Sequence, residues 1–448
     1  MSRDREATSS TLIALGLFAG SAALLTYGLL HLHSPGYLYD SDVYRHMGGE
    51  RVLRHMPLYG DADPSGLSGL FTYPPFAALL FTAIVRVPAP VYALAFPAAC
   101  AAALLASVWL SLRLVGRTTA LRGAGWARGV AEALVLAAIL LWIQPVRWTM
   151  FLGQINLFLL AMVLADFAAP RRRWYRGIAI GLAAGVKLTP ALFIVHLLVT
   201  RQFRAAVTAV VTFLGTVGVA LAVLPRDSVV FWRRAVFDTH RVGPQSYHDN
   251  QSLAGMLTRN LNLTELPTAT GLAVSAGVAA AGLGVAWFAD KRRHVLAGVC
   301  AVGVTGLLVS PISWSHHWVW FVPVFVLAWA TALRLRPGNL PAVLSRRRWV
   351  FSRWRSALVL AGVGTGWFLL SPPGFHHLTD RDPHLPRWVL HQAWYQALSR
   401  DIDVWLGIAA LAAIAVVAVH GSAPVPQPTP DAGSTGSAES LGSGERVR

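Results

Sequence analysis

The chain has 448 residues, of which 55% are apolar and only 13% are charged, and its formal net charge is +17. Soluble globular domains carry about a quarter charged residues. Here the charges fall in short clusters between apolar runs of about twenty residues, the length that crosses a bilayer. The composition excludes a soluble enzyme and predicts an all-α polytopic membrane protein. Cytoplasmic loops of membrane proteins are enriched in Lys and Arg. The basic excess therefore indicates which loops face the cytoplasm, and it is no evidence for binding of nucleic acid.

Ten apolar runs are predicted to be full spans. In chain order they cover residues 11–31, 91–115, 130–143, 151–167, 206–224, 269–288, 295–309, 318–332, 357–370 and 404–419. Two further apolar runs are interrupted by helix-breaking residues. Residues 76–87 end at Pro88 and fit an interfacial helix on the outer side, and residues 177–200 contain Lys187, Thr189 and Pro190 at their centre.

The basic clusters determine how the second interrupted run is folded. They occupy residues 113–128, 171–176, 201–204, 291–293 and 334–355. All five lie on the cytoplasmic side only if residues 177–200 form two half-helices that meet at Lys187–Pro190 and return the chain to its starting side. Each half is about 10–12 residues, or roughly 15–18 Å at 1.5 Å per residue, so the tip ends inside the membrane. The prediction is a bundle of about ten full spans plus this broken-helix hairpin, about twelve membrane helices in all.

The resulting map is a plasma-membrane protein with both termini in the cytoplasm. Residues 1–420 form one membrane domain, and its outer loops are residues 32–90, 225–268 and 371–403. The tail at 421–448 is rich in Gly, Ser and Pro and is predicted to be disordered. No Walker loop, dinucleotide fingerprint or zinc-ligand spacing occurs, so we expect no cofactor and no metal.

The first outer loop carries Asp40 and Asp42 directly after the first span. A carboxylate near an apolar boundary loses solvation, which raises its pKa and makes it a better proton acceptor. A solvated loop, in which these acids pair with Arg45 and its neighbours, is the alternative. The loop closes with Tyr73 and a pair of prolines, which end it rigidly and begin the interfacial helix.

Two amides and one cation are expected at membrane depth. Gln154 and Asn156 open a span, where they form helix–helix hydrogen bonds or recognise sugar hydroxyls. Lys187 is the one Lys or Arg well inside an apolar segment, and such a cation is costly unless it is paired or lies in a wet cavity. A lipid phosphate arriving from the bilayer would pair with it, and a structural ion pair is the alternative.

Two later segments carry the remaining candidates. His248, Asn250 and Gln251 suit carbohydrate binding in the second outer loop, although a capped helix starting near Asn250 explains the same residues. His316 and His317 join two spans at the outer face. Adjacent histidines on a helix point about 100° apart and seldom bind one metal ion, so contact with a phosphate or a sugar is the better interpretation, and histidines satisfied within the interface are the alternative.

Six motifs together resemble glycosyltransferase family 87, the polyprenyl-phosphate-mannose-dependent α-1,2-mannosyltransferases of actinobacteria. In chain order they are Asp40–Tyr44, Phe71–Phe76, Gly153–Leu157, Gly185–Pro190, Asn250–Ser252 and Ser310–Trp318. Among the members of this family, the sequence looks similar to the enzymes that extend phosphatidylinositol mannosides, lipomannan or lipoarabinomannan. The resemblance implies a GT-C fold, an active site on the extracytoplasmic face, a polyprenyl-phosphate-mannose donor and a glycolipid mannoside acceptor.

The resemblance also implies roles for the candidate residues. Asp40 matches the general base of the family, and Asp42, at a variable position of the motif, is a possible second acid. Lys187, His316 and His317 are expected to hold the donor phosphate. The residues expected to bind sugar or acceptor are Tyr44, Arg45, Tyr73, Gln154, Asn156, His248, Asn250 and Gln251.

Two other functions compete with mannose transfer. A GT-C enzyme that uses another sugar, such as arabinose, would have the same loops. A lipid or glycan transporter would use the broken hairpin as its substrate site, and it predicts inverted repeats, which the hydropathy pattern lacks.

Overall fold

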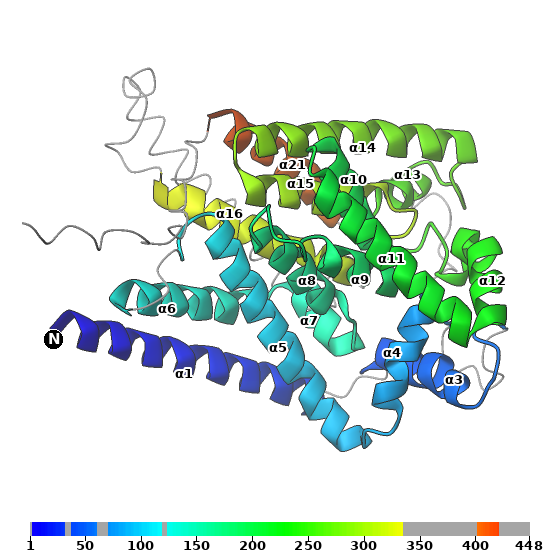
Figure 1. Cartoon of the computed structure of the whole chain (residues 1–448), viewed down its shortest axis with the longest axis horizontal. Helices are drawn as coiled ribbons and strands as arrows, with labels where there is room; N and C mark the ends of the chain where they lie inside the picture. The colour runs from blue at the N-terminus through cyan, green and yellow to red at the C-terminus, as the bar shows by residue number, and fades with distance from the viewer. Residues whose placement is uncertain (1, 32–36, 61–69, 119–122, 335–400, 421–448) are drawn as a thin grey trace, which may run out of the picture.

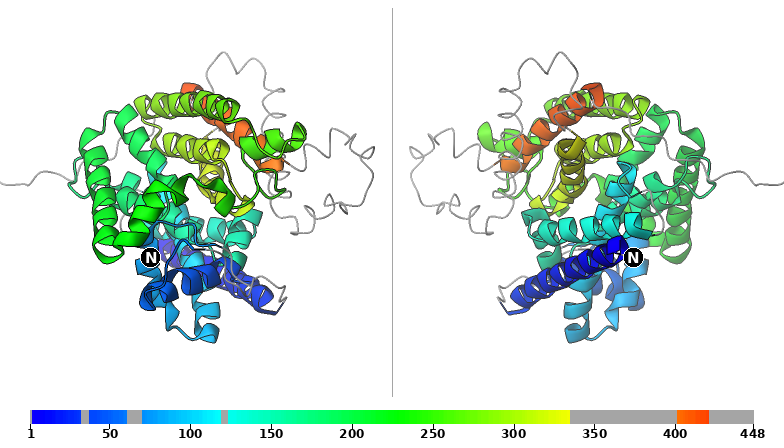
Figure 2. Two further views of the ribbon diagram at one scale, coloured as in Figure 1. Left: turned by 90° about the vertical axis from the view of Figure 1, so that its right-hand side faces the viewer. Right: turned by 90° about the vertical axis from the view of Figure 1, so that its left-hand side faces the viewer.

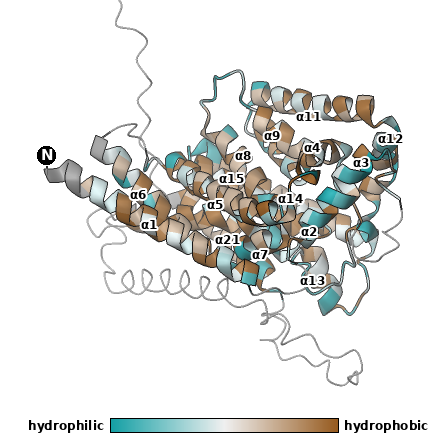
Figure 3. Cartoon of the chain, turned by 90° about the horizontal axis from the view of Figure 1, so that it is seen from below, coloured by the Kyte–Doolittle hydropathy of each residue, from teal (hydrophilic) through white to brown (hydrophobic). Residues whose placement is uncertain are grey.

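The structure is a computed structural model, and it describes residues 2–31, 37–60, 70–118, 123–334 and 401–420. These residues form helices and connecting segments, and one isolated bridge between Asn250 and Trp314 is the only extended pairing among them. Figure 1 shows the long helices laid side by side as a bundle. Figure 3 shows hydrophilic residues gathered on the short helices α3, α12 and α13 at one end of it.

The helices follow one another with short connections. They are α1 (Ser2–His31), α2 (Tyr39–Asp42), the π-helical η1 (Val43–Glu50), α3 (Arg51–Leu53), α4 (Pro75–Val85), α5 (Ala89–Leu114), α6 (Gly123–Leu140), α7 (Gln144–Leu152), α8 (Asn156–Ala168), α9 (Ile178–Val186), η2 (Thr189–Ala191), α10 (Leu192–Val199), α11 (Phe203–Val223), α12 (Pro225–Arg233), η3 (Ala235–Phe237), η4 (Thr239–Arg241), α13 (Leu253–Asn260), α14 (Thr268–Lys291), α15 (Val295–Val309), η5 (Ser315–Trp320), α16 (Phe321–Arg334) and α21 (Ile402–His420). The end-on views of Figure 2 place α1 and α6 on one flank and α14 and α15 on the opposite flank.

The described residues hold fewer long apolar helices than the sequence predicts for the same ranges. Six helices in the described ranges are long and apolar enough to cross a membrane, and a seventh span results if α6 and α7, bent by 75°, count as one. The predicted span at 151–167 is broken, because α7 ends at Leu152 and α8 begins at Asn156. With 13 and 15 residues, α8 and α15 are only about 20–22 Å long at 1.5 Å per residue. The predicted span at 357–370, the loop at 371–403 for all but its last three residues, and the tail at 421–448 lie outside the described residues.

The segment at 177–200 breaks where the sequence predicts. α9 ends at Val186, and α10 begins at Leu192 after the short η2. Both ends of the segment lie beside the last turn of α14. Just before α9, Arg171 forms an ion pair with Asp290, and just after α10, Arg201 lines a cavity with the same Asp290. The chain therefore returns to the end of the bundle from which it started.

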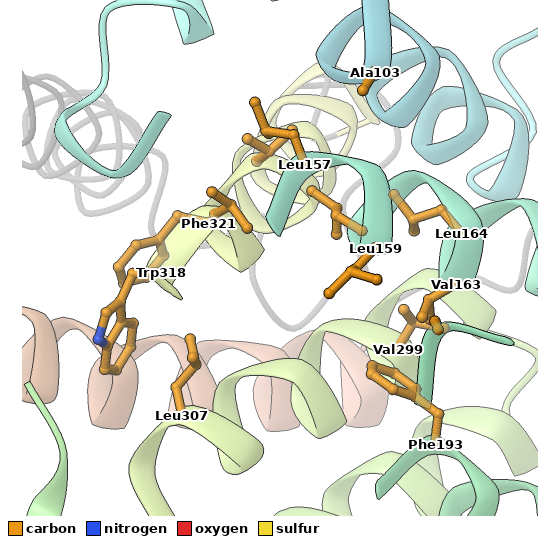
Figure 4. Close-up of a cluster of buried hydrophobic side chains, with 14 of the residues drawn as sticks. Ala103, Leu157, Leu159, Val163, Leu164, Phe193, Val299, Leu307, Trp318 and Phe321 are labelled. Carbon is orange, nitrogen blue, oxygen red and sulfur yellow. The ribbon is translucent and has the colours of Figure 1, made fainter. Parts of the chain in front are cut away.

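One apolar core joins helices from most of the described chain. Leu157 and Leu164 of α8 are buried there with Val299 of α15, and Figure 4 shows Val299 beside Phe193 of α10. Trp318 of η5 is fully buried against the same core. The packing holds α8, the α9–α10 hairpin and η5 together, and these elements carry the candidate site.

Candidate active site

The acidic segment after α1 is held against the end of α7. The backbone amide of Leu38 donates a hydrogen bond of 2.7 Å to the carbonyl of Phe151. Gly153 follows α7 with a φ of 75°, and a Cβ at this position would lie 2.5 Å from the Cβ of the buried Ser41. Glycine permits both the left-handed backbone and the close approach. This contact places Asp40, on α2, beside the residue that follows Gly153.

Asp40 is hydrogen-bonded to a buried network of three side chains. The amide nitrogen of Gln154 donates to Asp40 Oδ2 over 2.9 Å. The amide oxygen of Gln154 accepts from the hydroxyls of Tyr44 at 2.7 Å and Tyr73 at 3.0 Å, and these two hydroxyls are 2.7 Å apart. Because the tyrosines bind the oxygen, the Gln154 amide is oriented with its nitrogen toward Asp40. Four residues predicted for the site are thus brought together.

The two acids of this segment lie in different surroundings. Burial raises the pKa of Asp40 to about 6, although the Gln154 hydrogen bond and the Lys187 charge oppose the shift. Asp40 is therefore mostly ionised at neutral pH and more basic than an ordinary aspartate. Asp42 is exposed, and partial burial raises its pKa against the opposing charges of nearby basic side chains. Of the two, Asp40 has the environment of a proton acceptor.

Lys187 lies at the tip of the α9–α10 hairpin, where the backbone is extended (φ −146°, ψ 130°). Its ammonium donates to Asn156 Oδ1 over 2.9 Å and lies 3.1 Å from His317 Nε2. It is also 5.4 Å from the centre of the Tyr73 ring, a distance at which the ring face attracts a cation. Neither partner is an acid, so the charge of Lys187 is left to interact with Asp40 nearby and with an anion.

The two histidine rings of η5 make different hydrogen-bond contacts. Its backbone is anchored at the carbonyl of His316, which accepts from Thr149 at 2.9 Å and from Asn156 at 3.0 Å. His317 points to Lys187, whereas the His316 ring is 4% exposed and has no hydrogen-bond partner at either nitrogen within the described chain. The sequence predicted both histidines near Lys187, and only His317 is hydrogen-bonded to it.

The amides predicted to bind sugar in the second outer loop are engaged within the protein. Asn250 is fully buried and accepts from the backbone amide of Ser313 at 2.9 Å, and it donates to two backbone carbonyls. Gln251 donates to the carbonyl of His248 at 3.0 Å and accepts from the amide of Asp403. The Asn250 side chain docks the loop on the turn before η5, the Gln251 side chain joins the loop to the start of α21, and neither is hydrogen-bonded to Asp40.

Two further candidates also contact other parts of the protein. The guanidinium of Arg45 donates to the carbonyl of Val87 at 2.9 Å and lies 5.2 Å from the Tyr92 ring centre. The His248 ring lies against Tyr247, with ring centres 4.2 Å apart. Arg45 thus fastens η1 to the end of α4.

Asp249 is an acid that the sequence interpretation passed over. Burial raises its pKa to about 6, while the hydroxyl and backbone amide of Ser315 oppose the shift. The charge of Asp40 also raises the pKa of Asp249, as the smallest of the causes, so the two carboxyls are near enough for their charges to interact. The sequence signal for Asp249 was weak, because an acid among polar neighbours is typical of a solvated loop.

A cavity of about 40 Å³ adjoins Lys187. Its polar side is formed by Lys187, Asn156 and His317, and the rest of its lining is mainly apolar. The apolar residues come chiefly from α8, α10, α15 and η5 and include Leu159, Leu160, Leu192, Phe193, Leu307 and Trp320. A cation and two hydrogen-bonding groups at the head of an apolar cavity suit a ligand with an anionic head and an apolar tail.

A polytopic membrane helix bundle with a half-buried carboxylate near a cation fits a class of enzymes that act on lipid-linked substrates. The sequence profile of glycosyltransferase family 87 matches residues 71–311. A polyprenol-phosphate-mannose-dependent α-(1-2)-phosphatidylinositol pentamannoside mannosyltransferase of Mycobacterium tuberculosis is 33% identical over 91% of this chain and 87% of its own length. The chain belongs to glycosyltransferase family 87 and is a glycosyltransferase, as its motifs predicted.

A second relative, from Mycolicibacterium smegmatis, is named as a polyprenol-phosphate-mannose-dependent α-(1-2)-phosphatidylinositol mannoside mannosyltransferase. It is 37% identical over 77% of this chain and 79% of its own length. A Mycobacterium tuberculosis protein with the same name is 34% identical over 76% of this chain and 81% of its own length. No solved structure shows a significant match.

Proposed function

We propose that this glycosyltransferase moves mannose from a polyprenol-phosphate-mannose donor to a phosphatidylinositol mannoside or related lipid-anchored mannoside, forming an α-1,2 linkage with inversion. The names of the relatives support this donor and acceptor. The observation that carries the proposal is the pairing of a basic carboxylate, Asp40, with a cation, Lys187, whose described partners are neutral. A transfer from a lipid phosphate needs these two groups.

The reaction assigns one task to each group. Asp40 removes the proton from the acceptor 2-hydroxyl, and the freed oxygen attacks the anomeric carbon of the donor mannose. The bond from that carbon to the phosphate oxygen breaks, and the polyprenyl phosphate leaves with the electron pair. Lys187, with Asn156 and His317 around it, stabilises the negative charge that grows on the leaving phosphate. The proton remains on Asp40 until solvent accepts it.

The cavity next to Lys187 supports a lipid donor. Its polar residues would receive the phosphate, and its apolar lining from α8, α10 and α15 would receive the first prenyl units. In this proposal the hairpin tip is the point where an anionic head coming from the bilayer meets its cation.

Sidedness belongs to the same proposal. The basic residues 171–176, 201–204 and 291–293 gather at the end of the bundle where α9 begins and α10 ends, and such clusters favour the cytoplasmic side. Lys187 lies at the far end of α9 from them. We therefore place the site at the extracytoplasmic face and both termini in the cytoplasm, in a GT-C-type bundle that the short apolar helices complete.

The test is transfer by the purified protein in lipid nanodiscs. Radiolabelled polyprenyl-phosphate-mannose is supplied with a phosphatidylinositol mannoside, and the linkage of the product is determined. We expect α-1,2-mannosylated glycolipid, with Asp40→Asn lowering kcat by about 10²–10⁴-fold, the usual contribution of a general base. A preference for polyprenyl-phosphate-arabinose would overturn the sugar assignment. Loss in Asp42→Asn with activity retained in Asp40→Asn would overturn the choice of base.

A further inference from the structure

The loop before α13 is fastened to the turn before η5 by backbone and side-chain hydrogen bonds. Asn250 and Trp314 form the isolated bridge, and the amide of Gln251 donates to the carbonyl of Ser313 over 2.7 Å. In this antiparallel pairing Asp249 lies opposite Ser315, whose hydroxyl is buried and has no hydrogen-bond partner within the described chain, and Ser315 lowers the pKa of the Asp249 carboxyl. The position of Asp249 is therefore set by the fold of two segments far apart in the chain.

Within the described chain, no basic side chain forms an ion pair with Asp249, and the basic residue whose charge acts on it is Arg259. The Arg259 guanidinium is bonded to Asp401, with Nε 3.0 Å from Oδ1, and it also donates to the carbonyls of Tyr247 at 2.7 Å and Asn250 at 2.9 Å. Its charge reaches Asp249 only as a distant influence on the pKa. The carboxyl of Asp249 keeps acceptor capacity beyond Ser315.

Next to Ser315, the His316 ring is buried with both nitrogens unpartnered in the described chain. A buried polar group without a hydrogen bond is destabilising, and native structures retain few of them. The backbone of His316 is fixed by Thr149 and Asn156, so the ring cannot relieve this by a shift of the turn. A bound ligand that offers hydroxyl groups would satisfy it.

Charge decides which ligand fits. Asp249 lies close enough to Asp40 for their charges to interact, and two neighbouring carboxylates repel a phosphate. A carboxylate, a serine hydroxyl and an imidazole are instead suited to the hydroxyl groups of a neutral sugar, which donate and accept hydrogen bonds. Lys187 and His317 occupy the side of Asp40 where an anion is favoured. The His316 ring meets the His317 ring edge to face, with ring centres 4.6 Å apart, so a ligand that bonds to His316 adjoins the anion side.

We propose that Asp249, Ser315 and His316 form a subsite for a sugar of the acceptor, and that this subsite presents one hydroxyl of that sugar to Asp40. The inference rests on the proposed function and adds residues to it. Asp249 binds neighbouring hydroxyls of the acceptor sugar, and the reacting hydroxyl is thereby chosen. His316 belongs to the acceptor side, contrary to the sequence-based expectation that it holds the donor phosphate.

The test separates acceptor binding from donor binding. Asp249→Asn and Ser315→Ala are compared with wild type in nanodiscs, and KM is measured for the phosphatidylinositol mannoside and for polyprenyl-phosphate-mannose separately. We expect Asp249→Asn to raise the acceptor KM about tenfold or more, as for loss of a charged hydrogen bond, and to leave the donor KM within about twofold. Ser315→Ala is expected to give a smaller change in the same direction. Asp238→Asn, an exposed acid of the same loop, is the matched control and keeps both constants.

Each of the following outcomes would overturn the proposed subsite. An equal or larger rise in donor KM assigns Asp249 to the donor. If Asp249→Asn lowers the melting temperature and leaves both KM values of the folded protein unchanged, the role of Asp249 is structural, at the start of η5. If Asp249→Asn does not fold, an unchanged acceptor KM in Ser315→Ala rejects the proposal. Failure of the proposed function looks different, because wild-type protein would then transfer no mannose from the polyprenyl donor at all.

Discussion

Replacing Gln154 by leucine tests whether the buried amide sets the basicity of Asp40. The change removes the 2.9 Å hydrogen bond to the carboxylate and keeps the side chain nearly the same size. A hydrogen bond to a charged group contributes about 1.5–3 kcal/mol. At about 1.4 kcal/mol per pKa unit, its loss raises the pKa of Asp40 from about 6 to about 7–8. The acid limb of the pH profile therefore moves to higher pH.

The magnitude follows from the ionised fraction. At pH 7 this fraction falls from about nine tenths to between about one half and one tenth, so kcat/KM for mannose transfer falls about 2–10-fold and recovers near pH 9. The assay is the pH dependence of kcat/KM between pH 5 and 9, with Gln144→Leu as a control, since Gln144 is a buried glutamine at the start of α7 outside this network. An unmoved acid limb, or an equal loss at every pH, would refute the reasoning.

Three other changes test the hairpin and its tip. Lys187→Met should raise the KM for the polyprenyl donor tenfold or more, because the phosphate loses its cation, and Lys187→Arg should restore part of the affinity; an unchanged donor KM contradicts the assignment. Asp166→Ala should lower the free energy of unfolding by about 1–3 kcal/mol, measured by thermal or denaturant unfolding, because this carboxylate accepts from two backbone amides at the start of α9. Single cysteines at Arg172 and Arg201 should react with a membrane-impermeant reagent from the same side of the membrane, and one at Tyr39 from the other; labelling of the first two from opposite sides would disprove the hairpin.

Local chemistry and charge patterning predicted the hairpin. Lys187 and Pro190 interrupt an apolar run, and the helix breaks there. Basic residues flank both ends, and both ends meet α14. The signal was strong because a cation and a proline coincide there; a proline alone is tolerated, as Pro97 is inside α5.

Other parts of the site depend on residues far away in the chain. Asn250 and Gln251 have the chemistry of sugar binders, yet their amides meet backbone groups near residues 311–313 and 403. Asp249 lies between polar neighbours and gains importance only because Ser315 is placed beside it. A local pattern identifies hydrogen-bonding capacity, but the fold decides whether a protein group or a ligand uses it.

The predicted span at 151–167 is interrupted for a related reason. Apolar length alone treated residues 151–167 as one span, although Gly153 turns the chain where it contacts Ser41. The residue that requires this turn is more than one hundred positions earlier. Hydropathy therefore predicted the class of protein more reliably than the ends of its helices.

The wide spacing of the site along the chain has a consequence for biosynthesis. Asp40 follows the first helix, Lys187 lies near the middle of the chain, and His317 lies beyond α15. A nascent chain that has inserted only its earlier helices holds a carboxylate without its cation, or both without the histidine that contacts the cation. If the proposed roles of these residues are right, transfer activity begins only after η5 has packed against α8, and synthesis and insertion of most of the protein precede the first productive binding of a donor.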